Sequence, residues 1–210
     1  ILKNVTAETA DYEPLALEQH RFHGHLGKLI QRATQDFKAP EPDLEDVDKM
    51  AEMINACKKP MLICGGGVRY GEAHEEFKAF AEATGIPFGE TQAGKGAVLY
   101  DHPLNLGGVG VTGCSAANGI AKEADVIIGI GTRYTDFTTA SKWLYQTDAK
   151  FVNINPSEFH AAKMDAVPVL ADANEALLAI GAELEKIGYH TDEAYAASVA
   201  AYRKEWFEEI

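Results

Sequence analysis

The sequence has 210 residues, 46% hydrophobic and 24% charged, which is typical of a folded domain that buries a core without disulfides or metals. Its formal net charge of −13 argues against a nucleic-acid partner, because binding to phosphates requires Lys and Arg in excess on one face. No run of about 18 apolar residues is present and no charged-then-apolar leader opens the chain, so no membrane span is predicted.

The leading residues, 1–42, are poorly patterned. They carry His20, His23 and His25 without acidic partners at metal-ligand spacing, which favours a solvated segment over a metal site. The prolines at positions 40 and 42 interrupt any regular element. We therefore predict that residues 1–42 form an interdomain linker. Because the chain begins with Ile1, we expect it to be cut from a longer protein.

Short apolar segments alternate with amphipathic ones between residues 43 and 188. Helical spacing of apolar residues predicts helices over residues 47–54, 73–85, 116–124 and 176–187. Nearly continuous apolar runs predict strands over residues 60–64, 86–88, 125–130, 151–154 and 167–170. This alternation is typical of an α/β fold, an open, doubly wound parallel sheet of about six strands, Rossmann-like, with helices on both faces. Residues 189–210 are predicted to form a C-terminal helical linker.

Cys57, Cys64 and Cys114 are widely spaced and form no Cys-x-x-Cys pair. The spacing predicts neither a disulfide framework nor a zinc site, and it fits the reducing cytoplasm.

Ligands of open parallel sheets bind beyond the carboxyl ends of the strands, so the loops after the predicted strands are the candidate site. Gly65, Gly66 and Gly67 follow the first strand and precede a helix expected to begin near Gly71. Their backbone N–H groups could face an anion. Equally, the glycines could serve only to let helix and sheet approach closely.

Residues 89–95 fit the phosphate-loop pattern Gly-x-x-x-x-Gly-Lys. The next residue is Gly96, where a nucleoside triphosphatase needs Ser or Thr for magnesium, and residues 100–103 interrupt the helix that should follow. The segment argues against a triphosphatase. Thr91, Gly94 and Lys95 could still line a pocket for a phosphorylated or polar ligand.

Residues 108–113 match the dinucleotide pattern Gly-x-Gly-x-x-Gly, but residues 101–106 before it are not expected to form a strand. A nicotinamide site is therefore disfavoured. Arg133, in the loop after strand 125–130, could pair with a phosphate or carboxylate and be oriented by Asp136. A purely structural ion pair between the two is the alternative.

Asn153 and Asn155 lie at the end of strand 151–154, where asparagine is a common loop residue. Asp172, with Glu175 three positions later, favours a helix cap over a ligand contact. No constellation of nucleophile, base and orienting acid can be assembled from the chain.

In this order, the loops resemble the central domain of the thiamine-diphosphate enzyme family that includes acetohydroxyacid synthase. The resemblance covers about residues 59–178 and is carried by residues 58–67, 84–87, 94–96, 101–103, 123–133 and 171–177. Residues 90–95, 104–113, 131–139 and 163–166 are similar to a branch of the family that hydrolyses a cyclic dione in inositol breakdown.

The resemblance implies a three-domain enzyme of which this chain is the middle, a structural and subunit-contact domain without activity of its own. Thiamine diphosphate and Mg²⁺ would be held by the other two domains, since the Gly-Asp-Gly and Asn-Asn motif is missing here. The implied reaction converts trihydroxycyclohexane-1,2-dione to 5-deoxyglucuronic acid by ring C–C hydrolysis. The implied partners are the first and last domains and further copies of the subunit.

In flavin-containing relatives the middle domain holds FAD. Carried over residue by residue, the resemblance would place a set of loop residues around such a ligand: Gly65, Gly66, Gly67, Thr91, Gly94, Lys95, Gly107, Gly110, Gly113, Gly131, Arg133, Asn153 and Asp172. Flavin-binding relatives usually carry an acid at the position of Asn153. The first hypothesis is therefore a cleft without nucleotide, and the alternatives are a working FAD or ADP site and a free-standing nucleotide-binding enzyme of another family.

Overall fold

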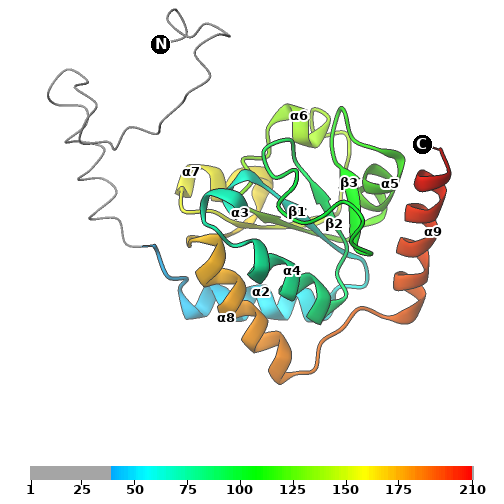
Figure 1. The fold of residues 1–210 in the computed structure, drawn as a ribbon. Coiled ribbons are helices and arrows are strands. Elements are labelled where there is room, and N and C mark those ends of the chain that lie inside the picture. The colour runs from blue at the N-terminus through cyan, green and yellow to red at the C-terminus, as the bar shows by residue number, and fades with distance from the viewer. Residues whose placement is uncertain (1–38, 210) are drawn as a thin grey trace, which may run out of the picture. The chain divides into compact units, whose positions relative to one another are not determined.

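A parallel sheet organises the chain. The computed structural model describes residues 39–209. Its sheet has six strands in the order β3-β2-β1-β4-β5-β6, and every neighbouring pair is parallel (Figure 1). The strands are β1 Pro60–Cys64, β2 Phe88–Glu90, β3 Asn105–Gly108, β4 Val126–Ile130, β5 Lys150–Ile154 and β6 Val167–Val169. The predicted open, parallel α/β sheet is confirmed.

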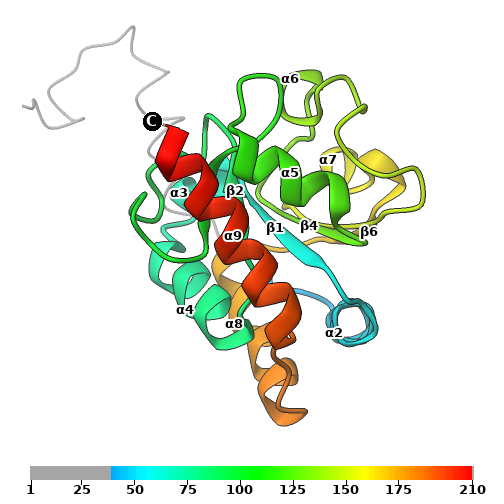
Figure 2. The same cartoon turned by 90° about the vertical axis from the view of Figure 1, so that its right-hand side faces the viewer.

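Helices cover both faces of this sheet, with α2, α4 and α8 on one side and α5 and α9 on the other (Figure 2). The helices are α2 Leu44–Ala56, α3 Gly66–Tyr70, α4 His74–Thr84, α5 Ser115–Glu123, α6 Asp136–Thr139, α7 Glu158–Ala161, α8 Ala173–Lys186 and α9 Glu193–Glu209. Successive strand residues point to opposite faces, so Ile128 joins the first core and Ile127 the second. Both faces of the sheet are buried, which explains the continuous apolar runs in the sequence.

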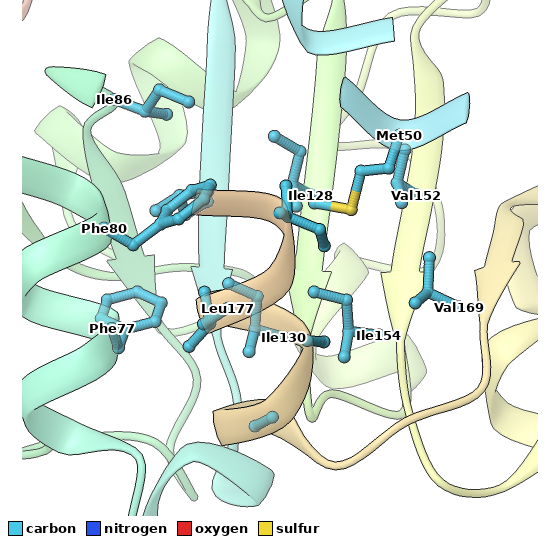
Figure 3. Packing of buried hydrophobic residues seen from close by; sticks show 14 of the residues in the cluster. Met50, Phe77, Phe80, Ile86, Ile128, Ile130, Val152, Ile154, Val169 and Leu177 are labelled. Carbon is cyan, nitrogen blue, oxygen red and sulfur yellow. The ribbon is translucent and has the colours of Figure 1, made fainter. Parts of the chain in front are cut away.

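The first core lies between the sheet and helices α2, α4 and α8. Ile128, Ile130 and Val152 from the strands meet helix side chains such as Leu177 there (Figure 3). The rings of Phe77 and Phe88 pack edge to face, with centroids 5.1 Å apart. Burying each such side chain contributes about 1.5–3 kcal/mol, so this layer supplies much of the stability of the fold.

Aspartates cap two of the helices. The carboxylate of Asp43 accepts from the N–H of Glu45 at 2.8 Å at the start of α2. The carboxylate of Asp172 accepts from the N–H of Asn174 at 2.9 Å, which confirms the predicted cap of α8.

Two predicted details were wrong. Residues 105–108 form the edge strand β3, although no strand was expected before the Gly-x-Gly-x-x-Gly segment. Asn and Gly have poor strand propensity, and here pairing with β2 and cover from α9 provide the stability that propensity does not. The first helix after β1 begins at Gly66 and ends at Tyr70, and α4 starts afresh at His74, instead of one helix starting near Gly71.

The last helix, α9, packs on α5 (Figure 2). Tyr195 donates its hydroxyl to the Pro60 oxygen at 2.9 Å, and Tyr202 donates to Glu123 at 2.6 Å. Arg203 donates to the main-chain oxygen of Asn105 at 3.3 Å. Residues 193–209 therefore pack as part of the helical layer that α5 and α9 form on the second face of the sheet.

Candidate functional site

The predicted cleft lies where the sheet changes direction. Strand β1 pairs with β2 on one side and with β4 on the other, so the chain order reverses between β1 and β4. The loops that leave these two strands are adjacent: the N–H of Gly65 donates to the Ile130 oxygen at 2.9 Å, and that of Gly67 to the Gly131 oxygen at 3.0 Å. This is the position at which open α/β sheets bind ligands.

The glycines of these two loops pack backbone to backbone. A Cβ on Gly131 would lie 2.4 Å from the Cα of Gly67, and Gly131 itself has a φ of +61°. A Cβ on Gly94 would lie 2.1 Å from the main-chain oxygen of Cys64. Glycine is therefore required at these positions for close approach within the protein.

Most of the glycine N–H groups predicted to face an anion are engaged within the protein. Seven of the eight predicted glycines donate their N–H to protein acceptors: Gly65, Gly67, Gly94, Gly107, Gly110, Gly113 and Gly131. Phosphate cradles work by leaving several such N–H groups free to point at the ligand. The loops lack that arrangement.

The segment after β2 is a series of turns. Thr91 is buried; its hydroxyl oxygen accepts from the Gly94 N–H at 3.1 Å and its main-chain oxygen from the Lys95 N–H at 2.9 Å. Lys95 is exposed. No helix forms between residues 91 and 104 of the described chain, in keeping with the argument against a triphosphatase.

Glu90, which the sequence reasoning did not single out, holds this segment in place. Its side chain is 3% exposed and accepts from the N–H of Gly96 at 3.1 Å. Burial raises the pKa of this carboxyl, opposed by the Gly96 N–H, by Asn105 and by Lys95. The available signal was an acid two residues after the predicted strand 86–88, where the observed strand β2 ends.

The Gly-x-Gly-x-x-Gly segment is held from α5. The amide of Asn118 accepts from the Gly110 N–H and donates to the Gly110 oxygen, each at 2.9 Å. Gly107 lies against Trp206 of α9, so it packs on the second layer of the domain. The segment is a packing loop in which Asn118 serves as the anchor.

Asn153 and Asn155 both brace the loop after β4. The amide nitrogen of Asn155 donates to the Thr132 oxygen at 3.0 Å, and that of Asn153 donates to the His160 oxygen at 2.7 Å. The Asn153 amide oxygen and the His160 Nδ1 are buried and have no hydrogen-bond partner among residues 39–209. Burial, then Lys163 and Arg133, lower the pKa of His160.

Arg133 is exposed, and no ion pair joins it to Asp136 within the described part of the chain. The structural ion pair considered from the sequence is therefore not formed. Asp172 caps α8, and a Cβ on Gly71 would lie 3.0 Å from its carboxylate.

Two observations bear on a flavin. Seven of the eight predicted glycines donate within the protein, and the Asn153 amide donates to the His160 oxygen of α7. These contacts give no support to FAD as a resident cofactor. In the same residues, 39–209, no group of three His, Cys, Asp or Glu side chains is placed to hold a metal ion, and no helix is long and apolar enough to cross a membrane.

Comparison with known proteins identifies the architecture. Residues 47–180 match the family model described as "Thiamine pyrophosphate enzyme, central domain". The chain belongs to this central-domain family. A thiamin diphosphate-dependent enzyme isolated from Mycobacterium smegmatis has the same fold, with a TM-score of 0.59 and 22% identity over 69% of this chain and 28% of that one.

Curated relatives of the central domain share one name. The chain is 62% identical over 183 residues to 3D-(3,5/4)-trihydroxycyclohexane-1,2-dione hydrolase 2 of a Bacillus cereus strain, covering 87% of the chain. It is 61% identical over the same length to the hydrolase of Bacillus anthracis. In both comparisons the chain spans 28% of the relative's length.

Proposed function

We propose that this central domain is the structural, subunit-contact part of a longer thiamine-diphosphate-dependent hydrolase that opens the ring of 3D-(3,5/4)-trihydroxycyclohexane-1,2-dione. The observation that carries the proposal is the 62% identity over 87% of the chain to a relative of that name. The relatives are much longer, since the chain spans 28% of their length. We assign the catalytic groups to the parts of the longer protein that lie outside this chain.

In the proposed reaction, water opens one ring C–C bond. The hydroxyl of the water joins the carbonyl carbon on one side of the broken bond, which becomes the carboxylic acid. The proton of the water ends on the carbon on the other side of that bond, and the opened chain is 5-deoxyglucuronic acid. Thiamine diphosphate, when bound, supplies the electron sink for the carbanion. We place the cofactor and Mg²⁺ outside this chain, because the chain matches the central domain of the family and the resemblance assigns their sites to the other two domains.

The site geometry supports a domain without chemistry of its own. The loops at the carboxyl ends of β1 and β4 bind one another, and Glu90 is committed to the Gly96 N–H. We further propose a homo-oligomer in the cytoplasm, where the unpaired Cys57, Cys64 and Cys114 would stay reduced.

Turnover of the dione provides the test. The chain alone, supplied with thiamine diphosphate, Mg²⁺ and the cyclic dione, should give no 5-deoxyglucuronic acid, whereas a protein of the relatives' full length that contains it should. Product formed by the chain alone would contradict the structural role. A full-length protein that binds the cofactor and leaves the dione unchanged would contradict the substrate.

Titration with FAD and ADP tests the flavin alternative. Because the loop donors are engaged, isothermal calorimetry of the chain should show no saturable heat at micromolar concentrations. Saturable binding would show that the cleft opens to a nucleotide.

A further inference from the structure

A groove runs along the surface of the first helical layer, and its lining contains none of the predicted site residues. It encloses about 800 Å³ between α4 and α8, which lie side by side (Figure 1). Its lining is mostly small or apolar: Ala79, Phe80, Ala83, Leu177, Leu178, Gly181, Ala182 and Leu184, with Glu75, Glu76, Thr84, Glu185, Gly188, Tyr189 and His190 also lining it. Two parallel rows of small residues leave a channel in which another helix can approach closely.

Gly181 is the unexplained residue of this groove. It lies inside the 14-residue helix α8, where glycine costs roughly 0.5–1 kcal/mol relative to alanine. A Cβ at this position would meet only the ring of Phe80, at an ordinary contact distance of 3.6 Å. Nothing in residues 39–209 requires glycine there, in contrast to Gly131. Close approach by a group from outside this unit would account for the glycine.

The surface around Gly181 has the composition of a contact site. Leu178, next to the groove centre, is 57% exposed although it is a large apolar side chain on a regular helix. Three carboxylates line the groove, from Glu75, Glu76 and Glu185, and its lining contains no Lys or Arg. The groove therefore combines an apolar lining with three carboxylates.

We propose that this groove is the docking site of an amphipathic α-helix that presents small and apolar residues on one side and Lys or Arg on its flanks. The apolar side covers Leu178 and packs over Gly181. The cationic flanks meet Glu75, Glu76 and Glu185. A second copy docking through the same face would bring these carboxylates against each other, so charge complementarity favours a basic partner. This interaction is independent of the dione chemistry.

The probe is a synthetic amphipathic peptide of about 18 residues, long enough to form a helix, with Ala and Leu on one face and Lys on the flanks. Two peptides control for charge: one with Glu in place of Lys, and one with the Lys peptide's composition scrambled. Fluorescence anisotropy of the labelled peptides measures binding to the intact 210-residue chain. Only the amphipathic Lys peptide should bind saturably.

Gly181→Met places a long side chain in the groove: its Cβ meets only Phe80, at an ordinary contact distance, and methionine favours the helix over glycine. It should weaken the Lys peptide at least about tenfold, a loss of about 1.4 kcal/mol. Ala200→Met, at an exposed position on α9, is the matched control and should leave binding unchanged. A triple change of Glu75, Glu76 and Glu185 to Lys should reverse the preference, so that the Glu peptide binds more tightly than the Lys peptide.

Equal binding of the scrambled peptide, or equal binding to Gly181→Met, would overturn the proposal, since attraction to a protein of charge −13 would then explain it. Sedimentation velocity provides a second test. A dimer of the chain that Gly181→Met dissociates would mean that a second copy occupies the groove, and would also overturn the proposal.

Discussion

The side-chain amide of Asn153 donates to the main-chain oxygen of His160 at 2.7 Å and thereby ties the end of β5 to α7. Asn153 is fully buried, and its nitrogen also lies 3.5 Å from the oxygen of Thr132. The residue faces two carbonyl acceptors, so this position calls for a donor. That requirement accounts for an amide at this position.

Asn153→Asp should therefore destabilise the domain by about 3 kcal/mol at neutral pH, because a buried carboxylate would face carbonyl oxygens with no proton to donate. The loss should shrink on acidification, since the protonated acid can donate to His160. Urea unfolding at several pH values measures it. Asn153→Ala removes the bond without adding charge and should show a smaller, pH-independent loss. An aspartate variant as stable as the parent would mean that α7 does not depend on this bond.

The same residues show what the sequence could predict. Continuous apolar runs such as residues 126–130 identify buried parallel strands, because both faces of the sheet are covered. β3 has no such run, since two of its four residues are glycines and it is held by α9. Loop positions at the strand ends were predictable from the general rule for parallel sheets. The engagement of the Gly65 and Gly67 N–H groups was not, because their acceptors, Ile130 and Gly131, come from a distant segment of the chain.

Gly131→Ala and Gly96→Ala form a pair that separates backbone packing from backbone conformation. Both glycines have positive φ, +61° and +81°. A methyl group on Gly131 would collide with Gly67, whereas one on Gly96 would meet no atom within 4 Å. The conformational cost is about 1–2 kcal/mol in each case, and only Gly131→Ala adds a clash.

Gly131→Ala should therefore lower the free energy of unfolding by about 3 kcal/mol or more, whereas Gly96→Ala should lower it by about 1 kcal/mol. Thermal unfolding followed by circular dichroism compares the two. Equal losses would show that the β1 and β4 loops separate easily, which would reopen the cleft as a ligand site.

Glu90 gives the domain a pH dependence of defined sign. Burial raises its pKa above the ordinary value of 4.5, so the folded state holds the proton more tightly than the unfolded chain. Stability from this group is complete below about pH 4.5 and falls as the pH rises through the raised pKa. Glu90→Gln keeps an acceptor for the Gly96 N–H and carries no charge.

The Gln variant should therefore flatten the fall in unfolding free energy between pH 4.5 and neutrality and be at least as stable as the parent at about pH 7. Urea midpoints across that range measure the slope. Glu82 supplies the control, because it is exposed and bonded to His102. In Glu82→Gln the unfolding free energy should still fall with rising pH to the extent that Glu90 causes it. A parent profile that rises over this interval in step with Glu90 ionisation would contradict the assignment.

Two buried tyrosines of the second core should respond in opposite ways to loss of their hydroxyl. Tyr145 packs edge to face on Phe151, and its hydroxyl has no hydrogen-bond partner in residues 39–209. Tyr195 donates to the Pro60 oxygen at 2.9 Å, joining α9 to the start of β1. Burial raises the pKa of both phenols, so both remain neutral at physiological pH.

Tyr145→Phe removes an unsatisfied polar group and should leave stability unchanged or raise it by up to about 1 kcal/mol. Tyr195→Phe breaks a buried bond and should cost about 1–2 kcal/mol. Both variants remove a phenol hydroxyl oxygen. Chemical denaturation of the pair therefore compares a buried hydroxyl that has a hydrogen-bond partner with one that has none. A loss for Tyr145→Phe as large as that for Tyr195→Phe would show that the Tyr145 hydroxyl is satisfied in solution, with bound water as its partner.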